Sequence, residues 1–127
     1  MTGPPTKLKW FPTPNDGELT LFIGTAKGFF VLWRQNDIGI FESTVSERVA
    51  EGQEILDAAI DDKDSDIVQI VIGTNGRTVQ LWNYMVDGSL EIQYSVRFEG
   101  TIPRGVAFVS KSNGTSVAVF GLKDGLV

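Results

Sequence analysis

The stretch Ile72–Trp82, IGTNGRTVQLW, decides the fold because it recurs twice in the chain. An earlier copy, Ile23–Trp33, reads IGTAKGFFVLW, and a third copy begins at Phe120 as FGLKDG. The three copies start at residues 23, 72 and 120, which are 49 and 48 residues apart. A near-constant period of this length indicates a repeat protein. We therefore predict a lead-in at residues 1–7 and repeats at about residues 8–54, 55–101 and 102–127.

Short apolar runs separated by turn residues predict β-strands along the whole chain. The Asn75-Gly76 pair predicts a two-residue hairpin turn with positive φ at both positions, and we expect this geometry to hold the turn. Four strands per repeat predict an all-β protein of four-stranded antiparallel sheets, an arrangement typical of β-propeller blades. The predicted strands are residues 8–11, 18–23, 29–33, 38–41, 55–60, 67–72, 78–84, 90–99, 106–109 and 115–120, with residues 43–54 as a long connection.

Residues 90–99 show the clearest alternation of apolar and polar side chains. Strict period two with one charged face predicts an outermost strand that is wet on one side. The residues expected together on its apolar face are Leu90, Ile92, Tyr94, Val96 and Phe98.

The composition excludes several kinds of chemistry. The chain has no cysteine and no histidine, so disulfides, thiolate nucleophiles and Ser-His-Asp triads cannot form. Eleven basic against sixteen acidic residues give a net charge of −5, which disfavours nucleic acid as a partner. No run approaches the roughly 20 apolar residues of a membrane span, and residues 1–7 lack the apolar core of a signal peptide. We expect a non-enzymatic intracellular protein, cytoplasmic or nuclear, without cofactor, metal or membrane contact.

The triplets Leu32-Trp33-Arg34 and Leu81-Trp82-Asn83 resemble those that end the third strand of each blade in the WD-repeat family of β-propellers. That family also has a Ser or Thr eight residues before the Trp, which Thr25 and Thr74 match. The resemblance covers roughly residues 8–127 and implies a divergent propeller segment. Most members of the family are non-catalytic interaction scaffolds.

The departures from the family pattern concern its buried Asp–His–Ser/Thr–Trp hydrogen-bond network. The chain has no histidine, so that network lacks one member in every repeat. The family's turn Asp is replaced by Lys27 in one copy and Gly76 in another, and Arg77 stands where the turn Gly would be. Gly28 and the Asp124-Gly125 pair keep the family residues.

About two and a half repeats cannot close a ring of four to eight blades. Because one aromatic side chain buries about 150–250 Å², an uncovered blade face would expose on the order of 600 Å². Three alternatives would account for the uncovered ends. The chain is part of a longer gene product, or the ring is completed by self-association or by a partner that supplies blades, or the blades form an open stack that aggregates readily.

Three charged residues lie at matching turns between the second and third strand of each repeat, namely Lys27, Arg77 and Asp124. The resemblance implies that these turns share one rim of the disc, where partners often bind, so they are candidate protein-binding residues. The alternative is that they are ordinary exposed turn residues. The expected function is a protein-interaction scaffold, and the alternative is a truncated or divergent segment with only a structural role, which requires further blades or self-association.

Two other patterns receive structural interpretations. The DDKDSD segment at residues 61–66 has alternating aspartates like a calcium loop, but Ile67 and Gly73 replace the required Gly and Glu. We interpret it as a solvated turn. Trp33 and Trp82 occupy equivalent repeat positions, so core packing is expected of both, and Trp10, matched by Phe108 in the third repeat, is interpreted in the same way.

Overall fold

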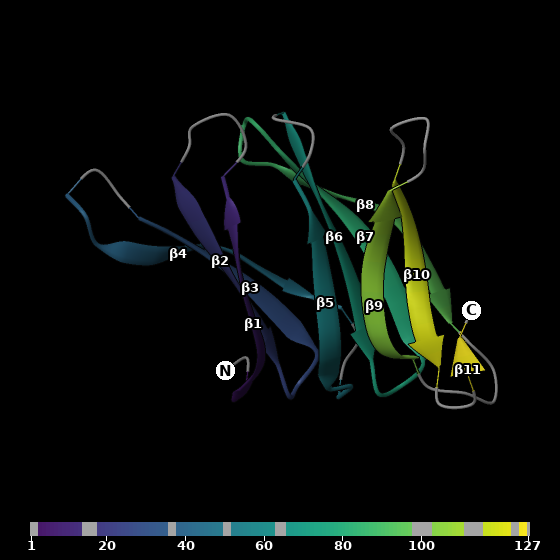
Figure 1. Ribbon diagram of the computed structural model, residues 1–127. Helices are drawn as coiled ribbons and strands as arrows, with labels where there is room; N and C mark the ends of the chain where they lie inside the picture. The colour runs from purple at the N-terminus through teal and green to yellow at the C-terminus, as the bar shows by residue number, and fades with distance from the viewer. Residues whose placement is uncertain are drawn as a thin grey trace.

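The computed structural model describes residues 3–13, 18–35, 38–49, 52–62, 66–97, 103–110, 116–122 and 125–126. Three antiparallel sheets stand side by side in chain order (Figure 1), with strand orders β1-β2-β3-β4, β5-β6-β7-β8 and β11-β10-β9. We call these sheets blade 1, blade 2 and blade 3. The strands are β1 Pro5–Pro12, β2 Leu19–Thr25, β3 Phe29–Gln35, β4 Phe41–Arg48, β5 Ile55–Asp61, β6 Ile67–Thr74, β7 Thr78–Met85, β8 Leu90–Arg97, β9 Pro103–Ser110, β10 Ser116–Leu122 and β11 Gly125–Leu126.

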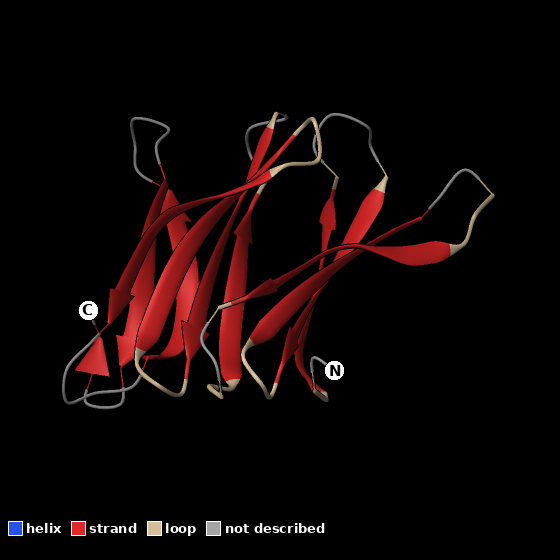
Figure 2. Ribbon diagram, turned by 180° about the vertical axis from the view of Figure 1, so that it is seen from behind, coloured by secondary structure: helices blue, strands red, loops and turns tan. Residues whose placement is uncertain are grey.

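Every regular element among the described residues is a strand (Figure 2), and these residues do not close into a ring or barrel. The predicted all-β class and the four-stranded antiparallel sheets are therefore confirmed. The result has the form of an incomplete propeller-like segment.

The strand registers repeat from blade to blade. The first and second strands of each blade pair with one shift near the start of the first strand, and the third and fourth strands of blades 1 and 2 pair with a shift just before Trp33 and Trp82. A β-bulge of this kind inserts one extra residue and re-aims the side chains that follow. The equivalent pairs after the first-strand shift are Lys7 with Gly24, Asp57 with Gly73, and Gly105 with Gly121.

The main core lies between blades 1 and 2. We call the side of a blade that faces the next blade its front face and the opposite side its back face. The front face of blade 1 contributes four large buried side chains, and the back face of blade 2 packs on them with aliphatic residues, Trp82 and Tyr84. Aromatic edges meet across this interface, with ring centroids 5.2 Å apart for Phe30 and Trp82 and 6.1 Å apart for Phe11 and Tyr84. The front-face residues of blade 1 are Phe11, Phe22, Phe30 and Leu32.

A smaller core joins blades 2 and 3. Val71, Val79 and Leu81 on the front face of blade 2 pack with Val106 of β9. Because side chains alternate across a strand, Val79 and Leu81 face forward while Trp82 faces back. Blade 2 is therefore covered on both faces, and β6 and β7 are buried at most positions along their length.

Two predicted boundaries are wrong. β1 begins at Pro5, inside the predicted lead-in, because Thr6 and Lys7 bond to the neighbouring blade. β4 spans Phe41–Arg48, so the predicted strand at residues 38–41 overlaps it only at Phe41, and half of the predicted connection at residues 43–54 is strand. The sequence pattern did not predict this strand because most of its residues are polar. β4 is the outermost strand of its sheet and therefore needs few apolar side chains.

The alternation in β8 does not give a single apolar face. β8 is the outermost strand, as predicted, but its pairing shifts by one residue so that Ile92 lies opposite Trp82 whereas Val96 lies opposite Val79. Trp82 faces back and Val79 faces forward, so Ile92 and Val96 lie on opposite faces of the sheet.

The hairpin at Asn75-Gly76 also differs from the prediction. Gly76 does not have positive φ, and the residue in the left-handed region is Arg77, with φ of 71°. The Arg77 N–H donates to the Thr74 carbonyl at 3.3 Å, so the connection is a three-residue loop that ends in a left-handed residue. Gly28 holds the equivalent position in blade 1 with φ of 87°.

Candidate functional site

The turns β2–β3 and β6–β7 lie along the same edge of the blades, at the bottom of Figure 1. Lys27 in the first turn is exposed and Arg77 in the second is partly exposed. The Lys27 side chain covers Gly3, because a Cβ added to Gly3 would lie 2.7 Å from Lys27 Cγ. Each cation lies in its own turn, and the third candidate, Asp124, lies outside the described residues.

A threonine supports each turn from below. Thr25 Oγ1 accepts from the Phe29 N–H at 3.2 Å, and Thr74 Oγ1 accepts from the Thr78 N–H at the same distance. Thr74 Oγ1 also donates to Gln53 Oε1 at 2.7 Å. The expectation that Asn75-Gly76 geometry alone holds the second turn is therefore wrong, since buried side-chain bonds brace it.

The connection between blades 1 and 2 docks on the β6–β7 turn. The Asn75 N–H donates to the Glu54 carbonyl at 2.9 Å, and the Glu54 N–H donates to Asn75 Oδ1 at 3.0 Å. This reciprocal pair fixes Asn75 beside the linker, so the rim at this turn is built from two separate segments of the chain.

Gln80 is a structural residue that the sequence did not reveal. Its Oε1 accepts from Trp82 Nε1 at 2.9 Å, and its Nε2 donates to the Val49 carbonyl at 3.2 Å and to Ser95 Oγ at 3.3 Å. A polar residue amid apolar neighbours on a buried strand was the available signal. Val31 holds the equivalent position in blade 1.

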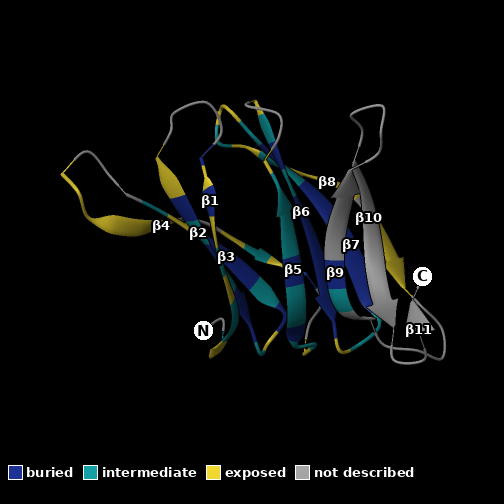
Figure 3. Ribbon diagram, viewed as in Figure 1, coloured by how far each residue is buried: buried dark blue, intermediate teal, exposed yellow. Residues whose placement is uncertain are grey.

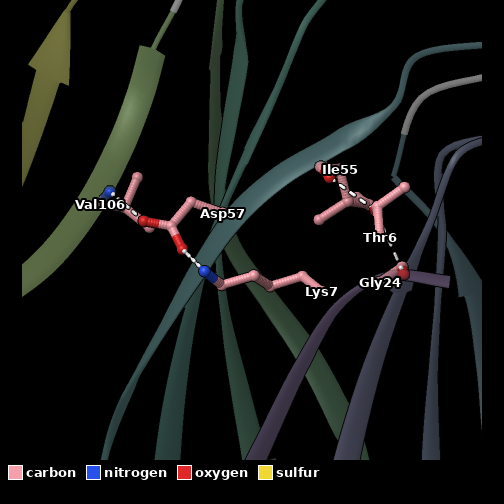
Figure 4. Close-up of polar contacts among 6 residues, drawn as sticks. All are labelled: Thr6, Lys7, Gly24, Ile55, Asp57 and Val106. Carbon is pink, nitrogen blue, oxygen red and sulfur yellow. Dashed lines mark hydrogen bonds and ion pairs between the residues drawn. The ribbon is translucent and has the colours of Figure 1, made fainter.

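The innermost strands of the three blades are joined by polar contacts (Figure 4). Lys7 Nζ lies 3.0 Å from Asp57 Oδ1, and the Val106 N–H donates to Asp57 Oδ2 at 3.1 Å. Thr6 Oγ1 donates to the Ile55 carbonyl at 2.7 Å and lies 3.3 Å from the Gly24 carbonyl. Asp57 thus bonds with both neighbouring blades. The sequence does not predict this contact, because Lys7 and Val106 each lie about 50 residues from Asp57 along the chain.

Gly24 permits the close approach of blades 1 and 2 at this point. A Cβ added there would lie 2.6 Å from Ile55 Cγ2, which is closer than side chains tolerate. A glycine in a strand interior commonly marks such an approach of another element.

Blade 1 has exposed residues on β1 and along β4, whereas β6 and β7 of blade 2 are mostly buried (Figure 3). The large exposed side chains Leu8, Trp10, Leu19, Trp33 and Phe41 lie on the back face of blade 1, although Val31 on that face is buried. Trp82 is 8% exposed, which confirms core packing, but Trp33 is 37% exposed and Trp10 is 56% exposed, so core packing is wrong for those two. The reason is positional: both exposed rings lie on the face that would look toward a preceding blade. Trp10 and Phe41 contact each other there edge to face, with centroids 5.7 Å apart.

The described residues hold no group of three or more acidic, histidine or cysteine side chains able to bind a metal ion. Asp62 and Asp66 are exposed on the β5–β6 connection, and Asp64 lies outside the described residues. At Asp87 the Ser89 hydroxyl and N–H both donate to the carboxylate and lower its pKa. This is local turn chemistry at an exposed site.

No family model and no curated protein matches the chain. Within the described residues, no helix is long and apolar enough to cross a membrane. Function must therefore be inferred from the geometry of the turns and of the blade faces.

Proposed function

We propose that the chain is a non-enzymatic protein-interaction scaffold of WD-repeat-like blades, which binds a protein partner through its rim turns. The observation that carries the proposal is the pair of repeat-equivalent turns that present Lys27 and Arg77 on braced hairpins. A rigid β framework that displays loops is a common way to build a binding surface. The partner would also contact Asp124 if the third turn lies on the same rim.

The conformation of Arg77 supports this role. A residue other than Gly at positive φ is energetically unfavourable by about 1–2 kcal/mol, and such outliers gather at functional sites. Gly28 occupies the same position in the blade 1 turn without this cost. The arginine at position 77 is therefore explained more readily by contact with a partner than by stabilisation of the β6–β7 turn.

Affinity purification with the tagged chain tests the proposal. We expect one protein at stoichiometric yield, lost when Lys27→Ala and Arg77→Ala are combined and retained in Glu91→Ala, which removes an exposed charge at the opposite end of blade 2. A partner that the double variant retains at full yield, or capture of chaperones alone, would contradict rim binding.

The second candidate function is a structural one, in which the chain is a truncated or divergent propeller segment that requires further blades or self-association. The exposed back face of blade 1 favours it. For either candidate we propose the cytoplasm or nucleus as the location, since a chain without cysteine is compatible with a reducing compartment. Microscopy of the fluorescently tagged chain tests this location, and secretion into the medium would contradict it.

A further inference from the structure

The back face of blade 2 is covered by another blade, whereas the equivalent face of blade 1 is not. Residues at equivalent register positions differ sharply in exposure: Leu19 is 50% exposed and Val68 2%, and Leu8 is 57% exposed and Ala58 1%. The chemistry of the two faces is similar, because both are formed mainly by aliphatic and tryptophan side chains. The difference arises because the front face of blade 1 covers blade 2, whereas no described residue covers the back of blade 1.

We propose that the back face of blade 1 is a docking surface for the front face of another four-stranded sheet of the same kind. The blade 1–blade 2 interface supplies the template, since the same register positions are already used there. The inference deepens the structural candidate function and concerns a surface distinct from the rim turns.

The exposed apolar area of this face is large enough for a binding surface. Its exposed large side chains are Leu8, Trp10, Leu19, Trp33 and Phe41. From their exposed fractions and typical side-chain areas, they present about 500 Å² of apolar surface. The largest apolar patch on a typical monomer is about 300–600 Å² and is often functional.

The rows of the face define the partner's chemistry. Leu8, Ile23 and Val31 are aligned across three strands, as are Trp10, Leu21 and Trp33 in the next row, and none of these six residues is charged. A partner face whose centre is rich in Phe and Leu, like the buried front-face residues of blade 1, matches them. In blade 2 the Trp82 N–H is satisfied by Gln80, but Val31 at that position has no acceptor in its side chain. The incoming sheet should therefore offer a hydrogen-bond acceptor to Trp33.

A second copy of this chain is the less suitable occupant. The front face of blade 1 is covered by blade 2, and β5 and β6 of blade 2 are covered by blade 3. The described part of blade 3 has three strands, and its outermost strand, β11, is only two residues long. Within the described residues, a second copy thus offers no uncovered front face of four strands. We therefore assign the site to a further blade.

The test uses the absence of cysteine, which allows one thiol to be introduced without competing reactions. Leu19→Cys places that thiol on the back face, and Val96→Cys, at a site 42% exposed on β8, serves as the matched control. Each variant is prepared as the full chain and as an extended chain in which an additional copy of residues 5–54 replaces residues 1–4. This junction keeps the repeat spacing, because Pro5 and Ile55 are register equivalents.

The measurement is the rate of thiol labelling by a soluble disulfide reagent. We expect the added blade to slow labelling of Leu19→Cys at least tenfold and to leave Val96→Cys unchanged. The protection should disappear when Phe22→Glu is placed in the added copy only. An unchanged Leu19→Cys rate in the extended chain, whatever the state of the added repeat, would overturn the inference.

Protection of Leu19→Cys in the unextended chain that grows with protein concentration would also overturn it, because a second copy would then be the occupant. Lys27→Ala with Arg77→Ala should not affect the labelling rate. Failure of the blade-docking inference and failure of the rim-binding proposal are therefore separate results.

Discussion

Gly76 provides a test of why a glycine occurs in the β6–β7 turn. Its φ is not positive, and Lys27 holds the equivalent position in the β2–β3 turn, so the backbone there accepts a side chain. A Cβ added to Gly76 would instead overlap the side chain of Gln53, whose Oε1 accepts from Thr74 Oγ1. We predict that the unfavourable part of the Gly76→Ala effect acts only through Gln53.

The expected magnitude follows from two opposing effects. Displacement of Gln53 breaks a hydrogen bond whose net contribution is about 0.5–1.5 kcal/mol. Replacement of Gly by Ala at a compatible φ stabilises by about 0.4–1 kcal/mol, because the unfolded chain loses conformational entropy. In the wild-type background these effects nearly cancel. In a Gln53→Ala background only the second remains, so Gly76→Ala should stabilise, and the coupling energy should be about 1 kcal/mol.

Urea unfolding of the wild type, both single variants and the double variant, followed by tryptophan fluorescence, measures this coupling. Lys27→Ala is the matched control at the equivalent position and should change stability by no more than about 0.5 kcal/mol. If Gly76→Ala destabilises by the same amount, more than about 1 kcal/mol, with and without Gln53→Ala, the backbone itself requires glycine and our reasoning is wrong.

Three further outcomes follow from the structure. Because positive φ favours glycine, Arg77→Gly should stabilise the protein by up to about 1 kcal/mol and Gly28→Ala should destabilise it by a similar amount. Urea unfolding measures both changes, and effects of the opposite sign would contradict this reasoning. Asp57→Ala should lower the free energy of unfolding by about 1–3 kcal/mol, because it leaves the Val106 N–H without its acceptor. Asp57→Asn keeps an acceptor and should lower it by less than about 1 kcal/mol in the same assay. Equal losses for the two variants would refute the bridging role. Because the pKa of Asp87 is lowered in the folded protein, the ionised carboxylate stabilises the fold at pH values above the pKa of the unfolded chain, about 3.9, and this contribution is lost as the pH falls through the lower pKa of the folded protein. Ser89→Ala should raise the pKa of Asp87 in an NMR titration. An unchanged pKa would refute the assignment to Ser89.

Several features of the candidate site follow from sequence pattern and others do not. The rim turns were predictable because turn residues recur at a fixed distance before Trp33 and Trp82. Gln80 and the Asp57 contacts were not predictable, because they depend on which strand of another blade lies opposite. Hydrogen bonds between residues 31 or 49 positions apart leave no local signal.

The period, the all-β class and the positions of most strands follow from the amino-acid sequence without the structure. So does the equivalence of Trp10 and Phe108, which the strand registers confirm at matching positions. These properties depend on local spacing, since turn residues and apolar runs act over a few residues. They require no knowledge of what lies across a sheet.

Only the tertiary structure decided which faces are covered. Trp33 and Trp82 have the same sequence context, yet one is 37% exposed and the other 8%, because blade 1 covers the back face that holds Trp82, whereas no described residue covers the back face that holds Trp33. The shift between Leu81 and Trp82 likewise separates Ile92 from Val96, although their spacing predicts one face. Burial and register depend on pairs of strands and of sheets. The repeat pattern therefore gives the position of a residue within its blade, whereas the adjacent blade determines whether that residue is buried or exposed.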